Sequence, residues 1–302
     1  MGKKILVVGS INMDLVVNTD EIPKVGETLL GNELLQIPGG KGANQAVAIA
    51  KLEKETYFLG KVGSDAFSET LIDSMNLSGV DTSLIEKADT SSGIAVINVD
   101  IKGNNNIVVI PGANNEVDID YLYRNEEIFK EVDVVLFQFE IPLETVKEGL
   151  KIAKKYDKLT IVNPAPAMDL DDETIKNIDI LVPNEHELAR MAKMEVVDED
   201  SLIKASNVLL EKGVKDIIIT LGSKGAMYVN KDNLKMYPSY NVKVVDTTAA
   251  GDSFIGGFIS SYVEDFDIDK AVDRGQKTAA LAIQKVGAQS SLPTKEEVDK
   301  FN

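Results

Sequence analysis

The feature that most constrains the fold is a regular alternation of short apolar runs and helical segments in the second half of the chain. From residue 133 onward, the expected strands are 134–137, 159–162, 180–182 and 217–220, and the segments between them have helical periodicity. Strands that are buried on both faces form continuous apolar runs, and the helices between them make right-handed crossovers. The pattern predicts an α/β fold with a doubly wound, mostly parallel sheet flanked by helices.

The N-terminal half adds one strand of the same kind and the material for a smaller sheet. Residues 5–8 are a β-branched apolar run, whereas 15–17 and 28–37 predict strands of a satellite sheet. Residues 94–99 and 107–110 flank a Gly/Asn-rich turn, which indicates a β-hairpin. We expect a single domain over residues 1–302, with a small β-sheet lid built from two segments, about 13–37 and 93–111.

Composition excludes several functional classes. The chain has no Cys and a single His, His186, so disulfides, thiolate nucleophiles and multi-His or Cys-ligated metal sites are impossible. A net charge of −17 argues against nonspecific binding to nucleic acid or to anionic membranes. No apolar stretch approaches the ~18 residues of a spanning helix. We expect a cytoplasmic protein in which His186 is exposed and not catalytic.

The strongest functional signal is the stretch from Asp246 to Phe254, where small residues separate a β-rich run from an apolar helix. Small residues at a helix start leave N–H groups free, and these groups and the helix dipole favour an anion such as phosphate. Asp252 lies within this positive region and could accept a proton while the amides neutralise charge developing beside it. The stretch therefore suggests phosphoryl transfer to a hydroxyl; a strand-to-helix turn with an acidic N-cap is the alternative.

Polar residues also follow the first expected strand and precede the next helix. Asn12 and Asp14 come just beyond residues 5–8, where ligands collect in open α/β sheets, although an Asx turn would use the same residues. Glycines on both sides of Lys41 would let its ammonium and the backbone approach a ligand closely; a plain turn before a helix is the alternative. The chain has no G-x-x-x-x-G-K-[ST] match, so Lys41 is not a lysine of that motif.

Three further segments follow expected strands. Glu140 could hydrogen-bond a ligand hydroxyl or cap the next helix. Asn184 and Glu187 share one face of a helical first turn, where Glu187 could hold water around Mg²⁺ or complement the helix dipole. The run from Thr220 to Gly225 allows a tight turn against a flat or phosphate-bearing ligand, but hairpin turns have the same composition.

Taken together, these segments resemble the ribokinase-like (PfkB) carbohydrate kinases, and the resemblance covers essentially the whole chain. It is carried by Asn12-Met13-Asp14, Gly39-Gly40-Lys41-Gly42-Ala43-Asn44-Gln45-Ala46, Asn163-Pro164-Ala165-Pro166, Pro183-Asn184-Glu185, Thr220-Leu221-Gly222 and Asp246 to Asp252. The resemblance implies ATP-dependent phosphorylation of D-ribose at its 5-hydroxyl. A same-fold kinase for deoxyribose, fructose or a nucleoside, and a non-catalytic sugar or nucleotide sensor, are the alternatives.

The resemblance also implies the roles of individual residues. Asp252 would be the general base, and the amides of residues 249–252 would form the anion hole for the transferring phosphoryl group. The sugar pocket would be lined by Asn12, Asp14, Gly40, Lys41, Gly42, Asn44 and Glu140. The nucleotide would contact Asn184, Thr220, Gly222, Gly225, Ala249, Ala250, Gly251 and Gln276. Gln276 is a departure, because family members often have His or Asn beside the adenine.

Two cations and an assembly are implied in the same way. Glu187 matches a family acid that is linked to Mg²⁺ and phosphate. A monovalent cation, usually K⁺, would lie near Asp246, Thr248, Ala282, Lys285, Gly287 and Ser291, several of which would contribute backbone carbonyls. A homodimer is expected through the lid strands, near 15–17 and 94–110, because an apolar hairpin would otherwise be exposed.

Overall fold

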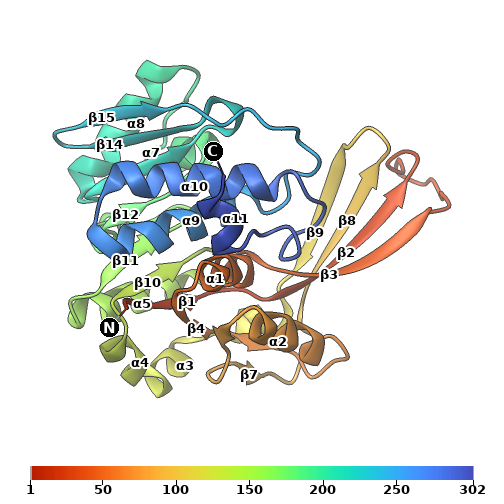
Figure 1. The fold of residues 1–302 in the computed structure, drawn as a ribbon. Helices are drawn as coiled ribbons and strands as arrows, with labels where there is room; N and C mark the ends of the chain where they lie inside the picture. Colours follow the sequence, from red (N-terminus) through yellow and green to blue (C-terminus); the bar gives the residue numbers. More distant parts are fainter. Residues whose placement is uncertain (1, 302) are drawn as a thin grey trace.

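A nine-stranded sheet forms the centre of the protein in the computed structural model, which describes residues 2–301 (Figure 1). The strand order is β15-β14-β13-β12-β11-β10-β1-β4-β6. All neighbours are parallel except β13–β14 and β14–β15, so the expected mostly parallel sheet is confirmed. The strands are β1 Lys4–Val8, β4 Glu55–Leu59, β6 Val80–Asp81, β10 Val134–Phe137, β11 Leu159–Val162, β12 Ile180–Leu181, β13 Asp216–Thr220, β14 Ala226–Asn230 and β15 Leu234–Tyr237.

Helices cover both faces of this sheet and form a separate apolar core on each. Alternate residues of β1 belong to different cores: Leu6 is part of the core that contains residues of α3, α4, α5, α7 and α8, and Val7 is part of the core that contains residues of α1, α2, α9 and α10. The helices are α1 Lys41–Lys51, α2 Ser68–Leu77, α3 Ile119–Arg124, α4 Glu126–Glu131, α5 Leu143–Lys155, α6 Asp172–Ile175, α7 Glu185–Ala192, α8 Glu199–Lys212, α9 Ala250–Asp265, α10 Ile268–Ala282 and α11 Lys295–Asp299. Within residues 2–301, no helix is long and apolar enough to cross a bilayer.

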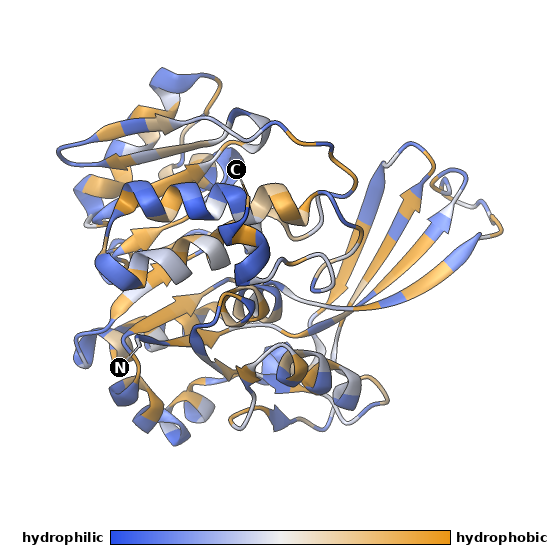
Figure 2. Cartoon of the chain, viewed as in Figure 1, coloured by the Kyte–Doolittle hydropathy of each residue, from blue (hydrophilic) through white to orange (hydrophobic). Residues whose placement is uncertain are grey.

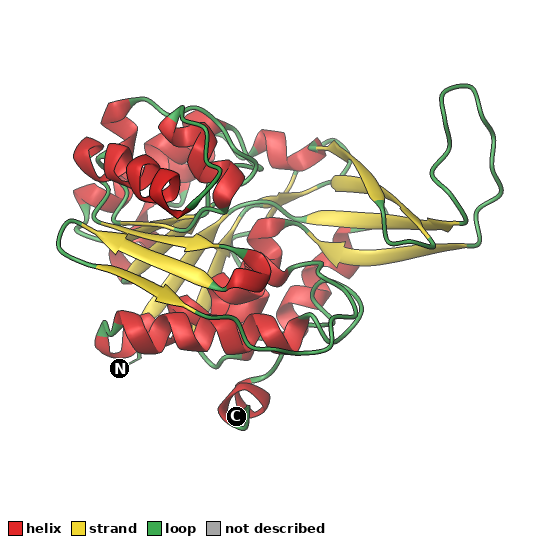
Figure 3. Ribbon diagram, turned by 90° about the horizontal axis from the view of Figure 1, so that it is seen from above, coloured by secondary structure: helices red, strands yellow, loops and turns green. Residues whose placement is uncertain are grey.

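A four-stranded sheet, here called the lid sheet, extends away from the main body (Figures 1 and 3). Its order is β3-β2-β8-β9, with β2 Asn12–Thr19, β3 Glu33–Gly39, β8 Gly93–Asp100 and β9 Asn105–Ile110. The hairpin expected from 94–99 and 107–110 is β8 and β9. The prediction of a strand over 28–37 was wrong at its start: residues 28–32 form a loop, and β3 begins at Glu33. A short pair, β5 Lys61–Val62 and β7 Glu86–Lys87, forms a third sheet.

Two elements near the site differ from expectation. Asn12 and Asp14 do not form an Asx turn; they open β2, where cross-strand pairing with β3 and β8 holds their backbone extended. Strand β15 was not predicted, because its four residues alternate only weakly between apolar and polar and lie at the exposed edge of the large sheet. His186 is exposed, as expected.

Close packing of α1 against α9 joins two segments that lie about 200 residues apart in the chain. A Cβ added at Gly256 in α9 would lie 2.3 Å from the Cβ of Ala48 in α1, a distance that real Cβ atoms do not reach. Figure 2 shows the mixed hydropathy along α9 and the mainly hydrophobic strands of the large sheet. The missing side chain at Gly256 therefore sets how closely the two helices approach.

We predict that Gly256→Ala destabilises the protein by about 1–3 kcal/mol, because the added methyl group overpacks this contact. The compensating change Ala48→Gly in the same chain should restore stability. It removes the facing methyl group, and its loss of helix propensity in α1 is offset by the gain in α9. Urea denaturation of the two single variants and the double variant measures the effect. Native-like stability of Gly256→Ala would show that the helix contact tolerates a methyl group.

Candidate active site

The N-terminus of α9 is the centre of the candidate site. Ala249 is its N-cap residue and has a left-handed backbone (φ 57°), and no side chain caps the helix. Ala250 N donates to Thr247 O (3.2 Å) and Ser253 N donates to Ala249 O (2.8 Å). Within residues 2–301, the N–H groups of Gly251 and Asp252 have no acceptor outside the helix itself. Free amides at a helix start favour an anion, as the sequence suggested.

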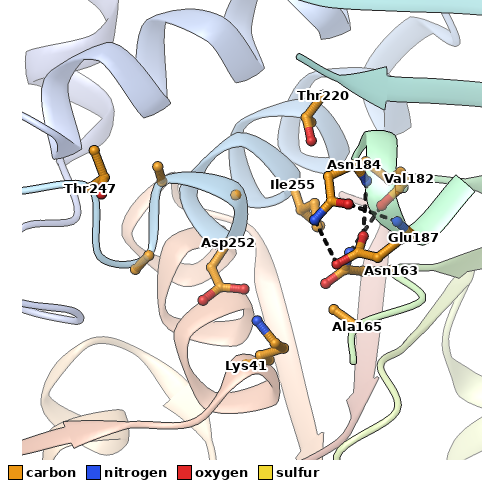
Figure 4. Close-up of a pocket in the computed structure, with 13 residues that line it drawn as sticks. Lys41, Asn163, Ala165, Val182, Asn184, Glu187, Thr220, Thr247, Asp252 and Ile255 are labelled. Carbon is orange, nitrogen blue, oxygen red and sulfur yellow. Dashed lines mark hydrogen bonds between the residues drawn. The ribbon is translucent and has the colours of Figure 1, made fainter. Parts of the chain in front are cut away.

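Asp252 is buried in the first turn of α9 and is held through both of its carboxylate oxygens. Asn44 Nδ2 donates to Asp252 Oδ2 (3.1 Å), and Gln45 Nε2 donates to Asp252 Oδ1 (2.9 Å). The Lys41 ammonium points toward the same carboxylate (Figure 4). Burial lowers the pKa of Lys41, but Asp252, Glu140 and other nearby carboxylates outweigh this effect and raise it, so the ammonium stays charged.

Residues of the predicted sugar pocket lie together beside Asp252, at the base of the lid sheet. Asn12 is buried, and its Oδ1 accepts from Asn114 Nδ2 (2.7 Å). Glu140 Oε2 accepts from Lys41 N (3.0 Å) and from Ser10 Oγ (2.6 Å). Glu140 therefore caps a helix, but that helix is α1, about 100 residues earlier in the chain, and not the next one. Sequence position alone could not identify this partner.

Glycines in the same region let the backbone approach closely. Gly40 has φ 89°, and a Cβ there would lie 2.8 Å from Asn12 N. A Cβ at Gly42 would lie 2.6 Å from Ser10 N. Only glycine fits at these two positions, so the start of α1 lies directly against the segment after β1.

Asp14 has an unusual environment for a carboxyl group. Burial, together with Glu140 and Asp252, raises its pKa to about 7, although Lys41 partly opposes the shift. Within residues 2–301, the shift arises from burial and nearby charges alone, and no hydrogen bond to its oxygens contributes. A Cβ at Gly39 would lie 2.3 Å from Asp14 Oδ2, so a glycine makes room for this carboxyl group. The group is therefore free to bind a ligand hydroxyl.

Two adjoining cavities lie on either side of the α9 N-terminus. The smaller, about 250 Å³, is lined by Lys41, Asn163, Ala165, Val182, Asn184, Glu187, Thr220, Thr247, Ala249, Ala250, Gly251, Asp252 and Ile255 (Figure 4). The larger, about 660 Å³, includes Gly222, Gly225, Phe254 and Gln276 in its lining. Both cavities share Thr220, Thr247, Ala250 and Gly251, so one extended ligand could occupy both.

The larger cavity contains most of the residues expected to contact a nucleotide. Gly225 has φ 102°, and a Cβ there would lie 1.9 Å from Tyr237 O, so this turn requires glycine. Gln276 is buried, and its Nε2 donates to Tyr237 O (3.1 Å) and Pro238 O (3.3 Å). The amide of Gln276 therefore fixes the chain after β15 against α10, and its side chain forms part of the cavity wall.

Asn184 and Glu187 form a capping box at the start of α7. Glu187 N donates to Asn184 Oδ1 (2.8 Å), and Glu187 Oε2 accepts from Asn184 N (2.9 Å). Glu187 thus caps α7 from its first turn, and the same carboxylate also lines the smaller cavity. Burial raises the pKa of Glu187, although the hydrogen bond from Asn184 N opposes this shift.

Asp246 connects the two loops that were expected to surround a monovalent cation. Its Oδ1 accepts from Thr248 N (2.8 Å), and its Oδ2 accepts from Gly287 N (2.9 Å). Lys285 and Ser291 use their side chains elsewhere: Lys285 Nζ donates to Glu297 Oε1 (2.7 Å), and Ser291 Oγ donates to Ala288 O (2.9 Å). Lys285 could therefore contribute only its backbone carbonyl, as could Ala282 at the end of α10, whereas the hydroxyl oxygen of Ser291 keeps lone pairs that could face a cation.

Sequence reasoning assigned no role to three buried amides that surround the site. Gln45 contacts Asp252 directly, Gln138 donates to Gln45 Oε1 (2.6 Å), and Asn163 Oδ1 accepts from Gln45 Nε2 (3.1 Å). The signal for Gln45 and Asn163 was present, because both belong to the motifs quoted above. Gln138 lies between two apolar residues after β10 and gave no signal.

Comparison with known proteins identifies the class to which this fold and site belong. The family model described as pfkB family carbohydrate kinase matches residues 2–295, so the chain belongs to the pfkB family of carbohydrate kinases. It is an enzyme that transfers phosphate to an alcohol group of a carbohydrate.

Individual relatives are similar over their full length. The ribokinase of Haemophilus influenzae is 39% identical, with 100% of this chain and 99% of the relative covered. The deoxyribokinase of Salmonella typhi is 38% identical, with 98% of each covered. A structure of Arabidopsis thaliana ribokinase complexed with ribose and ATP matches with a TM-score of 0.92 and 31% identity, and covers 100% of this chain and 99% of that chain.

We predict that Asp14→Asn stabilises the sugar-free protein by about 2–3 kcal/mol more at pH 8 than at pH 5. The pKa of Asp14 is raised to about 7 in the folded state, so the stability it contributes is full below the ordinary carboxyl pKa near 4 and is lost progressively as the pH rises to about 7. The amide carries no charge at any pH. Thermal denaturation between pH 5 and pH 8 measures the difference, and Asp89→Asn, on an exposed loop, is the control. A pH-independent difference would contradict the assigned environment.

Proposed function

We propose that the protein transfers the γ-phosphoryl group of ATP to the 5-hydroxyl of D-ribose, giving D-ribose 5-phosphate and ADP. The observation that carries this proposal is the position of Asp252. Its carboxylate is buried at an uncapped helix N-terminus, beside Lys41, where the predicted sugar pocket and the two cavities meet. Its closest partners are the amides of Asn44 and Gln45, which leave the group free to accept a proton.

The sugar lies beneath the lid sheet in this proposal. Asp14 and Glu140 accept hydrogen bonds from its hydroxyl groups, and Asn12 and Asn44 supply further polar atoms. Gly40 and Gly42 let the backbone approach the ring closely. Orientation of the hydroxyl against the phosphorus can contribute ~7–11 kcal/mol to the rate acceleration. Lid closure would exclude water from the reacting groups.

Phosphoryl transfer follows from this arrangement. The sugar oxygen attacks the γ-phosphorus in line with the leaving ADP oxygen, and Asp252 takes the hydroxyl proton. The amides of Gly251 and Asp252, with Lys41 beside them, stabilise the charge on the transferring group; a single such donor is worth ~3–4 kcal/mol. The adenine and ribose of ATP occupy the larger cavity, beside Gln276 and the turn from Gly222 to Gly225.

The residues present fit a magnesium ion that arrives with ATP. Within residues 2–301, no cluster of three His, Asp or Glu side chains could hold a metal ion on its own. Mg²⁺ is usually bound by one or two carboxylates together with substrate phosphates and water, and Glu187 supplies a carboxylate in the phosphate cavity. When bound, the ion would neutralise phosphate charge. Asn184 keeps the Glu187 carboxylate oriented.

A monovalent cation such as K⁺ fits the loops joined by Asp246. Both oxygens of Asp246 accept hydrogen bonds from these loops, which brings residues 246–248 against 287–291 directly beside the α9 N-terminus. The ion would be held beside Asp246 by Thr248, Ala282, Lys285, Gly287 and Ser291, several of them through backbone carbonyl oxygens. Its charge would add to the positive potential of the anion hole. The supply of ATP and the lack of cysteine both favour the cytoplasm as the compartment.

The first experiment measures ADP release with Mg-ATP for ribose, deoxyribose, fructose and adenosine, each with and without K⁺. We expect preferred turnover of ribose and a higher rate with K⁺. The deoxyribose arm matters because a deoxyribokinase is among the similar relatives. A higher kcat/KM for any other acceptor would overturn the assigned substrate but not the role of Asp252.

We predict that Asp252→Asn lowers kcat by about 10²–10⁴-fold, because the amide cannot accept the hydroxyl proton. Ribose affinity measured by calorimetry should change little, since the substituted side chain has the same shape. Asp246→Asn, in the cation loops, serves as a comparison whose loss of activity should instead depend on the K⁺ concentration. Near-native kcat in Asp252→Asn would remove the general base from the mechanism.

We also propose that two copies associate through their lid sheets. The strand β9 is at the edge of the lid sheet, and Ile107, Val108, Val109 and Ile110 are 43–61% exposed there. An exposed apolar edge strand of this kind needs a cover, because its unpaired backbone groups favour association. A second copy of the same strand is the partner that best matches it in length and character.

We predict a dimer of 32.8 kDa chains at micromolar concentration, and a monomer for Val108→Lys. The lysine puts a charge into each copy of the apolar contact and should weaken association by more than tenfold. Leu234→Lys is the matched control, because Leu234 is exposed on β15, an edge strand of the large sheet, and this variant should stay dimeric. Sedimentation equilibrium separates the outcomes, and a monomeric native protein would contradict the proposal.

A further inference from the structure

We propose that Gln45 is a positioning residue for the catalytic base, and that Gln138 and Asn163 set the orientation of Gln45. These three side chains form a connected group, here called the amide chain, that lies behind Asp252. The inference rests on the proposed role of Asp252 as general base. It adds that the base is aimed by the amide chain.

The contacts run in one direction through the group. Gln138 Nε2 donates to Gln45 Oε1 (2.6 Å), and Gln45 Nε2 donates both to Asp252 Oδ1 (2.9 Å) and to Asn163 Oδ1 (3.1 Å). Asn163 Nδ2 in turn donates to Val182 O (3.0 Å). The three members come from α1 and from the segments after β10 and β11, and the hydrogen bond to Asp252 connects them to α9.

Two acceptors, the carbonyl of Val182 and the carboxylate of Asp252, determine how each amide of the chain is oriented. A backbone carbonyl can only accept, so Val182 O requires the NH₂ group of Asn163 and leaves Asn163 Oδ1 facing Gln45. A carboxylate also only accepts, so Asp252 and Asn163 Oδ1 both require the NH₂ group of Gln45. The carbonyl of Gln45 then points to the NH₂ group of Gln138. One arrangement satisfies all of these contacts, and it presents hydrogen-bond donors to the base.

Burial makes this arrangement rigid. Gln45 and Gln138 are fully buried, and Asn163 and Asp252 are 8% and 7% exposed. Losing one partner in such a place leaves a buried polar group unpaired, which is costly. A Cβ at Gly9 would lie 2.2 Å from Gln138 Oε1, so glycine at position 9 makes room for the first member of the amide chain.

The geometry explains why the base needs two anchors. Gln45 holds Oδ1 and Asn44 holds Oδ2, so the plane of the Asp252 carboxylate is defined. Asn44 also belongs to the predicted sugar pocket, whereas Gln45 does not line either cavity. Gln45 therefore acts on the reaction only through Asp252. Small errors in the placement of a reacting group lower the rate strongly, because the bound complex then seldom reaches the geometry that the reaction requires.

The test compares Gln45→Met and Gln138→Met, which remove the amides but keep the side-chain length, with the double variant. Gln45→Met should lower kcat by about 10–100-fold, with the KM values for sugar and ATP within about threefold of native. Gln138→Met should have a smaller effect in the same direction. The double variant should be no slower than Gln45→Met, because Gln138 acts only through Gln45. The native protein is assayed with its preferred acceptor, so the outcome does not depend on which sugar that is.

A matched control separates positioning from a general loss of stability. Thr145 is a buried polar residue of α5, away from the site, and its Oγ1 donates to Val117 O (2.8 Å). Thr145→Val should lower the melting temperature and leave kcat unchanged. Should a methionine variant fold poorly, Gln45→Glu keeps the shape but turns an acceptor toward Asp252, and it should reduce kcat at least as much.

Combining Gln45→Met with Asp252→Asn in one protein distinguishes the proposed role of Asp252 from the proposed role of Gln45. In this double variant, Gln45→Met should cause no further loss of kcat, since no base remains to be positioned. If Asp252→Asn alone keeps native turnover, the proposed base is wrong. If Asp252→Asn loses turnover while Gln45→Met and Gln45→Glu keep native kcat, the base stands and the inference about Gln45 is wrong. Effects of Gln45 and Gln138 that multiply in the double variant would also overturn it.

Discussion

The close contact between α1 and α9 is the constraint on which the rest of the site depends. Gly256 lets the backbones approach at Ala48, one helical turn beyond Asp252 and Asn44 respectively. Because a helical turn is only 5.4 Å, this contact brings the side chains at the start of α1 within hydrogen-bond distance of Asp252. The proposed sugar-binding segment, the proposed base and the proposed anion hole are thereby parts of one helix pair. A small shift between these helices would disturb all three at once.

The net negative charge of the chain opposes binding of a phosphate-bearing ligand, and positive groups at the site offset this repulsion locally. The chain carries a net charge of −17, yet the proposed function places a highly charged anion beside Asp14, Glu140, Glu187 and Asp252. Positive potential comes from the free amides of α9 and from Lys41, whose pKa is raised by the surrounding carboxylates. The raised pKa of Asp14, about 7, reduces the negative charge near the phosphate when no sugar is bound. Local fields thus prevail over the charge of the whole protein at short range.

Sequence reasoning predicted the large sheet well and the lid edges less well. Buried strands such as β1 and β10 are continuous apolar runs, so their pattern does not depend on the partner strands. Strand β15 and the start of β3 depend on cross-strand pairing, which local sequence does not encode strongly. Of the candidate site, Asp252 and Lys41 were found through motifs, whereas Gln138 was missed. Its role comes only from a contact with Gln45, 93 residues away.

The sequence by itself determined the class of fold, the small residues at the start of α9 that favour an anion, and the residue types available for chemistry. These follow from periodicity, small residues before a helix and the lack of cysteine, which are all local or compositional properties. Only the tertiary structure decided the partners: Glu140 caps α1, Asp246 joins two loops, and the amide chain donates a hydrogen bond to Asp252. The physical reason is that a hydrogen bond depends on distance and direction in space, and packing sets both for residues that are remote in the chain.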